Sequence, residues 1–452
     1  MDICSSEIII IGGGASGLMA ATGAADTLAK CGKSGKVIVL EKMPRPGRKI
    51  LITGKGRCNF TNLKAWNEFS GHIHPKSSFL KPAFHNLTSE GMMDFLWKHG
   101  VESIVERGDR VFPASHLATD IVDALVKAAE SSGASIICNK SVTDIETCTT
   151  GAGTFSIRCK DGETYSCRKV IVATGGLSYP KTGSTGDGYR WASGFGHSIS
   201  PLFPSLTAIV PTGYKVEKTF DKSAVPCSSG KGHINRETAL SETGRSLCGN
   251  QLKNVGLTLV IDGNESQSEF GDLDFTDGGI EGPIGFKVSR KCVHAIINGS
   301  KVTAYLDMKP AIGLDELSAR ISSLWDNICK DGRNARKQYK ERFRLLLCKL
   351  MPTSLIPAFL KTNPNAGHDN LAKLLKGWKF DIAGYVGYER CVITSGGVSL
   401  SEVTPKTLES RLSEGLYFAG EILDLDADTG GYNLQTAFST GYLAGITAAK
   451  SL

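Results

Sequence analysis

The chain lacks long apolar runs. None of its 452 residues belongs to a stretch that approaches the ~18 apolar residues of a membrane-spanning helix. The apolar run at residues 8–11 has no basic segment before it and ends in three glycines, Gly12–Gly14. It is therefore too short and wrongly flanked to serve as a signal peptide. These absences predict a cytoplasmic protein without a membrane span.

Metal-ligand spacing is also missing. The 13 cysteines form no CxxC pair, and their odd number argues against a disulfide framework. Three aspartates, Asp424, Asp426 and Asp428, resemble the start of a calcium loop. However, Thr429 stands where such a loop requires glycine, and Gln435 stands where it requires a bidentate glutamate. We therefore predict no metal site and a reducing compartment.

Glycine is abundant, with 52 residues, and the net charge of +7 is concentrated in two segments. Residues 30–57 carry nine basic side chains against Glu41 alone, and residues 330–349 carry eight against Asp331 and Glu341. The glycines cluster beside apolar runs rather than in a repeat. Such clusters suit a backbone that approaches a ligand closely.

Apolar periodicity predicts an α/β fold. Buried strands are expected at residues 8–11, 36–40, 136–138 and 170–173, with helices at 15–30 and 119–131. Residues 155–159 and 163–167 flank Asp161-Gly162 and predict a hairpin. From residue 201 prolines and alternating segments predict an antiparallel β-rich insert, and residues 314–380 are expected to be helical. A buried strand at 416–420 and a helix at 433–450 predict that the chain returns to its first domain.

The first motif is Gly12-Gly13-Gly14-Ala15-Ser16-Gly17, between a strand and a helix. Gly12 permits the tight turn, Gly14 lets the backbone approach a diphosphate, and Gly17 lets the helix pack on the strand. Glu41 ends the second strand, where its carboxylate can accept hydrogen bonds from a ribose diol. This pattern predicts a dinucleotide site at a helix N-terminus.

The loop that follows, residues 44–62, distinguishes FAD from NAD. It is long, basic and glycine-rich, as an extended cofactor requires. Arg48 and Lys49 can partner phosphates, and Gly54 and Gly56 let the main chain lie along an isoalloxazine ring. Cys58 has no partner cysteine in sequence, which favours a packing thiol over a redox role.

The third motif is near the C-terminus, where Gly420-Glu421 ends a strand and Gly430-Gly431 precedes a helix. The partial positive charge of that helix N-terminus can stabilise the N1–C2=O side of a reduced, anionic flavin. Gly441 and Gly445 form a GxxxG pair, which we interpret as close helix packing. Ser16 has no paired base and is interpreted as a turn residue rather than a nucleophile.

Together these segments resemble the BaiN-like (YhiN-like) family of NAD(P)/FAD-dependent oxidoreductases. The resemblance rests on residues 54–62, 173–176, 394–398 and 416–433, and extends to 270–276 and Gly282-Pro283 in the insert; residues 213–250 depart from it. It implies a Rossmann-type, glutathione-reductase-like FAD domain at 1–200 and 385–452. A β-rich insert domain is expected at 201–312 and a helical segment at 313–384.

The expected FAD ligands combine the motifs with the resemblance. They include Val142, where such domains contact adenine through the main chain. The full set is Gly12, Gly14, Ala15, Ser16, Gly17, Glu41, Lys42, Arg48, Lys49, Gly54, Lys55, Gly56, Arg57, Cys58, Asn59, Val142, Gly175, Gly420, Glu421, Gly431, Asn433 and Leu434.

The sequence thus predicts an FAD-dependent oxidoreductase, with NADH or NADPH as a transient donor and a small organic substrate. One branch of the family acts on carbon–carbon double bonds of bile-acid intermediates. No second GxGxxG is present, because Gly183–Gly188 has the wrong spacing. Two alternatives stay open: an FAD-dependent nucleic-acid-associated factor, suggested by residues 330–349, and a flavin oxidase or monooxygenase. For 330–349 a solvated helix face is the favoured interpretation, so a nucleic-acid partner is not expected. No catalytic acid or base stands out.

Overall fold

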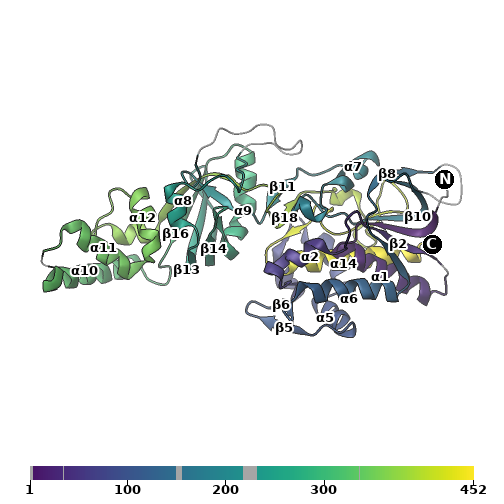
Figure 1. The fold of residues 1–452 in the computed structure, drawn as a ribbon, viewed down its shortest axis with the longest axis horizontal. Helices are drawn as coiled ribbons and strands as arrows, with labels where there is room; N and C mark the ends of the chain where they lie inside the picture. Colours follow the sequence, from purple (N-terminus) through teal and green to yellow (C-terminus); the bar gives the residue numbers. More distant parts are fainter. Residues whose placement is uncertain (1–3, 34, 149–154, 217–231, 335) are drawn as a thin grey trace. The chain divides into compact units, whose positions relative to one another are not determined.

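A computed structural model describes residues 4–33, 35–148, 155–216, 232–334 and 336–452 (Figure 1). The chain divides into two compact units, Met1–Leu202 with Ile393–Leu452, and Phe203–Val392. The expected boundaries were residues 200 and 385. Over the described ranges, no helix combines the length and apolar character needed to cross a membrane.

The first unit is built on a Rossmann-type sheet, as predicted. Its strand order is β7-β2-β1-β10-β9-β8, and β19 pairs with β10. Strands β1, β2, β7, β10 and β19 are parallel to their neighbours in this set, whereas β9 runs antiparallel to β10 and β8. The bounds are β1 Cys4–Ile11, β2 Val37–Leu40, β7 Ala134–Ile137, β8 Val142–Thr147, β9 Phe155–Cys159, β10 Thr164–Val172 and β19 Leu416–Phe418.

Strand β10 differs from the expectation of two separate segments. Residues 163–167 were predicted as half of a hairpin and 170–173 as an independent buried strand, but both belong to one nine-residue strand. Its first half pairs with β9 and its second half with β19. Near Lys169 and Val170, the neighbour of β10 on this edge thus changes from the antiparallel β9 to the parallel β19.

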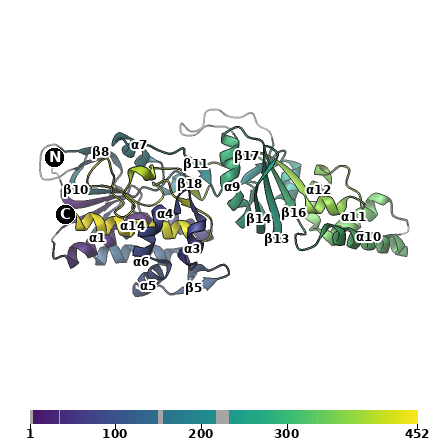
Figure 2. The ribbon, with the colours of Figure 1, turned by 180° about the vertical axis from the view of Figure 1, so that it is seen from behind.

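Helices cover the sheet (Figures 1 and 2). Helix α1 (Ala15–Lys30) packs closely on α14 (Tyr432–Lys450), because glycines remove the side chains between them. A Cβ at Gly445 would lie 2.1 Å from the Ala20 carbonyl oxygen, and one at Gly441 2.1 Å from that of Ser16. This confirms the packing interpretation of the GxxxG pair. Helix α6 (Ala118–Ser131) buries Ile121, Val122, Leu125 and Ala129, as predicted.

Smaller elements complete this unit. They are α2 Arg48–Ile52, β3 Thr61–Asn62, α3 Trp66–Phe69, β4 Ile73–His74, α4 Ser77–Asn86, α5 Ser89–Lys98, β5 Ser103–Glu106, β6 Arg110–Pro113, α7 Asp187–Gly194, β18 Ile393–Ser395 and β20 Asp426–Ala427. Strands β3, β6 and β5 form a three-stranded sheet, and β4 pairs with β20. This second pairing joins a segment near the N-terminus to one near the C-terminus.

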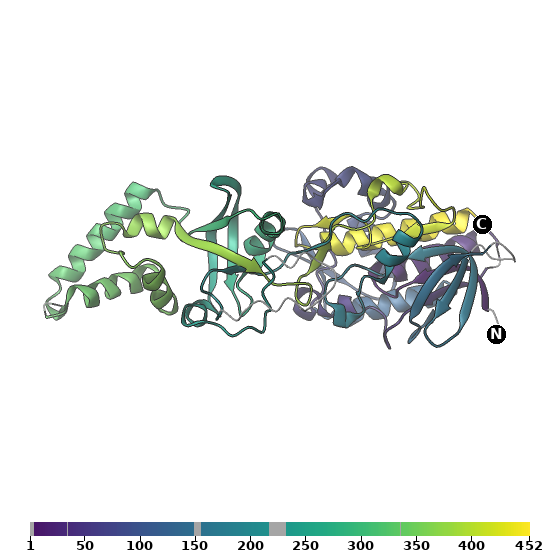
Figure 3. The same ribbon diagram turned by 90° about the horizontal axis from the view of Figure 1, so that it is seen from above.

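The second unit contains a closed barrel in the order β12-β15-β14-β13-β16-β17 (Figure 3). Its strands are β12 Ile209–Pro211, β13 Gln251–Ile261, β14 Asn264–Phe275, β15 Ile280–Glu281, β16 Val302–Asp307 and β17 Trp378–Tyr385, and β11 (Phe203–Ser205) precedes them. Helix α8 is Glu242–Leu247, and the helical segment comprises α10 Leu314–Lys330, α11 Tyr339–Leu350, α12 Ile356–Thr362 and α13 Leu371–Lys376. Residues 217–231 of the divergent stretch, including Pro226, lie outside the described residues.

Two predictions for this unit were wrong in detail. Helix α9 (Gly282–Ile297) lies inside the insert at 201–312, where alternating segments, one of them at 272–285, predicted antiparallel strands. Its apolar residues Ile284, Val288 and Cys292 recur every four positions and are buried, a helical period. Pro283 stands in the first turn, where proline is favoured. Strand β17 begins at Trp378, inside the segment expected to be helical, because Trp378 and Phe380 complete the barrel core.

Candidate functional site

The predicted cofactor residues gather where the parallel strands end. Gly12 follows β1, Glu41 follows β2, Thr174 and Gly175 follow β10, and Gly420 follows β19. The carboxyl ends of parallel strands meet at the same edge of a sheet. These residues therefore lie together along that edge. That edge is where open α/β sheets bind their ligands.

The glycine turn has the geometry that a diphosphate requires. Gly12 has φ +106°, and a Cβ there would lie 2.5 Å from the Ala173 carbonyl oxygen. A Cβ at Gly17 would lie 1.8 Å from the Gly12 carbonyl oxygen, so both positions are sterically fixed as glycine. Gly14 differs, because a Cβ there would meet no atom within 4 Å. It caps α1 without a side-chain hydrogen bond and leaves open space before the helix N-terminus.

Glu41 ties the second strand to the glycine turn. Its carboxylate accepts hydrogen bonds from the Gly13 N–H (2.6 Å) and the Met43 N–H (2.7 Å). Burial raises the pKa of this carboxyl, and the two backbone donors lower it less. Glu41 is thus held by the turn itself, at the strand end where a ribose diol was predicted to bind.

Lys49 and Glu421 lie far apart in the sequence but form an ion pair in the structure. The Lys49 Nζ lies 2.8 Å from Glu421 Oε2 and 2.9 Å from Ser178 Oγ. Glu421 Oε1 accepts hydrogen bonds from Ser178 Oγ (2.7 Å) and the Thr394 N–H (2.9 Å). Burial raises the pKa of Glu421, but the Lys49 charge and these donors hold it below its ordinary value. The two residues were predicted as separate ligands, so their mutual contact is a new feature of the site.

The remaining basic candidates have different surroundings. Lys42 forms an ion pair (2.7 Å) with Asp187, the first residue of α7. The Arg48 side chain is half-buried and interacts electrostatically with Glu41, but it forms no hydrogen bond or ion pair with any described residue. Lys55 is exposed, with φ +59° in the same left-handed run as Gly54 and Gly56. Of these three, Lys42 has an ion-pair partner, whereas no described residue forms an ion pair with Arg48 or Lys55, so both remain available to an anionic ligand.

Cys58 lies in the core beneath this loop. Its side chain is fully buried among Phe60, Met92 and Leu125, with φ +57°. Burial raises the pKa of the thiol to about 12, against a smaller lowering by a hydrogen bond with Thr53. A thiol with that pKa stays protonated at neutral pH, which supports the packing interpretation.

Arg57 contacts the small β3-β6-β5 sheet. Its guanidinium pairs with Glu106, lies 4.4 Å from the centre of the Phe112 ring and donates to His116 Nδ1. Three contacts fix this side chain before any ligand binds. If Arg57 binds FAD as predicted, either one of these contacts must break or FAD must accept a hydrogen bond from a guanidinium N–H that none of them uses.

Two buried polar atoms, one of them beside the N-terminus of α14, have no partner among the described residues. The helix has Gly431 (φ +99°) as its cap and no side-chain hydrogen bond there. A Cβ at Gly431 would lie 3.0 Å from Asn59 Oδ1, and that oxygen is buried without a hydrogen-bond partner among the described residues. Thr174 Oγ1, after β10, is also buried and unpartnered. Unpartnered polar atoms at the end of β10 and beside the α14 N-terminus fit a polar, extended cofactor such as FAD.

Some predicted ligands have side chains that contact other parts of the protein. The Asn433 side chain accepts from the Ala427 N–H and donates to the Ala427 carbonyl oxygen, at 2.9 and 2.8 Å. Ser16 is 5% exposed, and a Cβ on Gly420 would lie 2.5 Å from its hydroxyl oxygen. Ala15 and Leu434 pack at the edge of the core below, and Val142 begins β8. For these five residues a cofactor contact through the main chain stays a prediction.

Sequence reasoning missed a cluster of titratable groups beside α14. His72 Nδ1 lies 2.8 Å from Asp428 Oδ2, and His74 Nε2 lies 3.2 Å from Asp428 Oδ1. Burial raises the pKa of Asp428, but the hydrogen bonds from both histidines lower it to about 2. The His-x-His spacing, which places both rings on one face of an extended segment, is the signal that could have revealed it. Over the described ranges no group of histidine, cysteine, aspartate or glutamate side chains could hold a metal.

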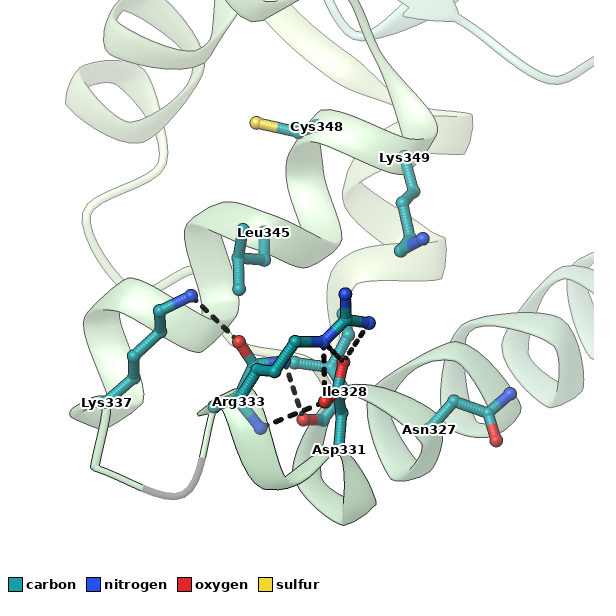
Figure 4. A pocket seen from close by; sticks show the side chains of 9 residues that line it. Asn327, Ile328, Asp331, Arg333, Lys337, Leu345, Cys348 and Lys349 are labelled. Atoms are coloured by element: carbon teal, nitrogen blue, oxygen red, sulfur yellow. Dashed lines mark hydrogen bonds and ion pairs between the residues drawn. The ribbon is translucent and has the colours of Figure 1, made fainter.

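Several residues of the basic segment 330–349 line a pocket between α10 and α11, together with Asn327 and Ile328 of α10 (Figure 4). Arg333 pairs with Asp331 (2.8 Å), and Lys337 donates to Asn334 Oδ1 (2.8 Å). Lys340, Arg344 and Lys349 are exposed on α11, and no described residue forms an ion pair with them. We call these three side chains the α11 basic face.

Comparison with known proteins matches nearly the whole chain. The profile of the HI0933-like protein Rossmann domain matches residues 6–447. A 3-dehydro-bile acid delta(4,6)-reductase of Clostridium scindens is 28% identical, over 98% of this chain and 99% of that protein. A ribosomal RNA dihydrouridine synthase of Haemophilus influenzae is also 28% identical, over 98% and 99%. A solved quinol-fumarate reductase is 15% identical with a TM-score of 0.50, covering 100% of this chain and 72% of that one, and supports the fold alone.

Proposed function

Because the chain belongs to the HI0933-like protein Rossmann-domain family and is an FAD-dependent oxidoreductase, we propose that it is an NAD(P)H-dependent reductase of an activated carbon–carbon double bond. The names of the two kinds of relative support this reaction. A delta(4,6)-reductase saturates a ring double bond, and dihydrouridine differs from uridine by two hydrogens across a double bond conjugated with a carbonyl group. A small organic molecule is the substrate class that we favour.

The single observation that carries the proposal is the meeting of the glycine turn, two uncapped helix N-termini and unpartnered polar atoms at the carboxyl edge of the sheet. The Gly12–Gly17 turn and the α1 N-terminus would hold the diphosphate, and Arg48 would neutralise part of its charge. Glu41 would meet the ribose, and Asn59 and the first N–H groups of α14 the flavin ring. The flavin supplies two-electron transfer when bound. The uncapped α14 N-terminus contributes partial positive charge, which favours negative charge on a reduced ring.

Anaerobic absorbance tests the donor. We expect the visible band of the bound flavin to bleach when NADH or NADPH is added to the purified holoprotein. Re-exposure to a cyclic enone such as 2-cyclohexen-1-one should then restore the band. A band that no pyridine nucleotide bleaches would contradict the donor assignment. Rapid peroxide release on admission of oxygen, without turnover of the enone, would instead favour a flavin oxidase.

A second candidate substrate is a uracil base carried in RNA. The specific observation is that α11 carries both the α11 basic face and Tyr339, whose ring belongs to a group of half-exposed aromatic rings. Tyr339 is 49% exposed, and its ring centre lies 5.2 Å from that of Trp325 and 6.0 Å from that of His368. Cations beside exposed aromatic rings are typical of single-stranded RNA recognition.

Neutralisation of the α11 basic face tests this second candidate. If RNA binds there, the variant K340Q/R344Q/K349Q should weaken binding of ribosomal RNA fragments and reduce the salt slope by about 0.7 per lost phosphate contact. The matched control is K30Q/K33Q/K36Q, which removes the same charge from three exposed lysines of the first unit. Equal weakening by both variants would indicate a non-specific charge effect. Wild-type protein that binds no RNA at low salt would exclude the candidate.

A further inference from the structure

His72, His74 and Asp428 form a two-histidine clamp on one carboxylate. Each imidazole uses one nitrogen for Asp428, which leaves His72 Nε2 and His74 Nδ1 without a hydrogen bond to any described residue. The two side chains are 26% and 32% exposed, and the aspartate is 20% exposed. The clamp is therefore partly buried but open to solvent, with one free ring nitrogen on each histidine.

The clamp is fixed to the first turn of α14. Strand β4, which carries His74, pairs with β20 through Asp426 and Ala427, and the Asp428 N–H donates to the His72 carbonyl oxygen (3.0 Å). Asn433 holds Ala427 from the helix side through both of its side-chain atoms. The His72 ring stacks on the ring of Tyr432, the first residue of α14, with centres 4.3 Å apart. These contacts place the histidines beside the helix end where the flavin ring is expected.

Other charges near the clamp come from the preceding segment and the β5–β6 turn. Glu68, which forms an ion pair with Lys64 (2.6 Å), interacts electrostatically with His72, and Asp109 interacts with Lys64 and Tyr432. Asp428 is the only one of these carboxylates that both imidazoles contact. Its low pKa means that it stays ionised throughout the neutral range and can hold a protonated histidine in place.

We propose that His72 is the general acid of the reduction and that Asp428 and His74 are its positioning residues. This inference rests on the proposed double-bond reduction. One carbon of the double bond receives a hydride, with its two electrons, from the reduced cofactor. The other carbon receives the proton from Nε2 of the His72 imidazolium. The histidine is left neutral and regains a proton from solvent, to which its side chain is partly exposed.

Reoxidation of pre-reduced holoprotein separates this role from a structural one. Dithionite-reduced protein is mixed anaerobically with 2-cyclohexen-1-one or with ferricyanide, which takes electrons without requiring a proton on carbon. For His72→Gln we expect enone-dependent reoxidation to slow on the order of a hundredfold, the range of general acid catalysis. Ferricyanide-dependent reoxidation should be unchanged. The loss of enone rate at alkaline pH in the wild type should be absent from the variant.

Two further variants keep the test decisive. His85→Gln removes an exposed histidine of α4 and should match the wild type in both reactions. Asp428→Asn should slow the enone reaction without slowing ferricyanide, and in the FAD-free protein it should displace the NMR titration of the His72 ring but not that of His85. Equal enone rates for His72→Gln and wild type would overturn the inference and leave the reductase intact. Wild-type protein that ferricyanide reoxidises but the enone does not would instead refute the proposed double-bond reduction.

Discussion

Replacement of Gly14 by valine is expected to weaken FAD binding severely while the apoprotein keeps its fold. Gly14 has φ −85° and ψ −167°, a conformation that any L-residue adopts, and a Cβ there meets nothing within 4 Å. The added side chain would instead occupy the space that the diphosphate requires above the α1 N-terminus. We expect FAD affinity to fall at least a hundredfold, or roughly 3 kcal/mol. Titration of apoprotein with FAD by fluorescence quenching measures the loss.

Gly17→Ala is the contrasting variant. Its Cβ would lie 1.8 Å from the Gly12 carbonyl oxygen, so the turn must open for the side chain to fit. The melting temperature of the apoprotein should therefore fall for Gly17→Ala and stay near the wild-type value for Gly14→Val. If Gly14→Val bound FAD as tightly as the wild type, the cofactor site at the end of β1 would be wrong.

Local physical requirements explain which parts of this site were predictable. Gly12 needs a positive φ, and Gly17 needs close contact with backbone, so both requirements appear in the sequence as glycine. The strand at 8–11 is likewise recognisable from its continuous apolar run, and helix α6 from the helical spacing of its buried residues. In these places the local conformation of the chain, which is visible in a short stretch of sequence, determines which residue type is found.

Pairings between distant segments could not be predicted in the same way. Lys49 and Glu421 are 372 positions apart, and each alone is an acceptable ligand for a cofactor. Strand β17 is recognisable only as the partner that closes the barrel beside β16. Such contacts depend on tertiary packing, which overrides local propensity.

Removal of the Lys49 charge should have the largest effect on stability. Lys49→Met leaves Glu421, whose side chain is 11% exposed, with only neutral donors from Ser178 and Thr394. An uncompensated buried carboxylate costs about 3 kcal/mol, toward the lower end of the usual range because Lys49 is partly exposed. Urea unfolding of the apoprotein at pH 7 measures this change. Ion pairs on the surface, such as Arg45 with Asp123, should contribute much less.

The sign of the pH dependence follows from Glu421. In the wild type its pKa is lowered on folding, so the ionised carboxylate stabilises the fold above the unfolded pKa. That contribution is lost as pH falls through the folded pKa. Without Lys49, burial is the dominant influence and should raise the folded pKa above the unfolded one. The carboxylate then destabilises the variant at neutral pH and ceases to do so once it is protonated. The stability difference between Lys49→Met and wild type should thus shrink as pH is lowered from 7 towards 5.

The double variant Lys49→Met/Glu421→Gln separates a structural tie from a ligand pair. A glutamine keeps the carbonyl oxygen that Ser178 and Thr394 contact, but it removes the buried charge, so most of the lost stability should return. If this stable double variant binds FAD with wild-type affinity, the pair serves to join α2 to the segment that follows β19. If it is stable but has lost FAD, both side chains bind the cofactor, as the sequence predicts. A double variant no more stable than Lys49→Met would contradict the assignment of the cost to a buried charge.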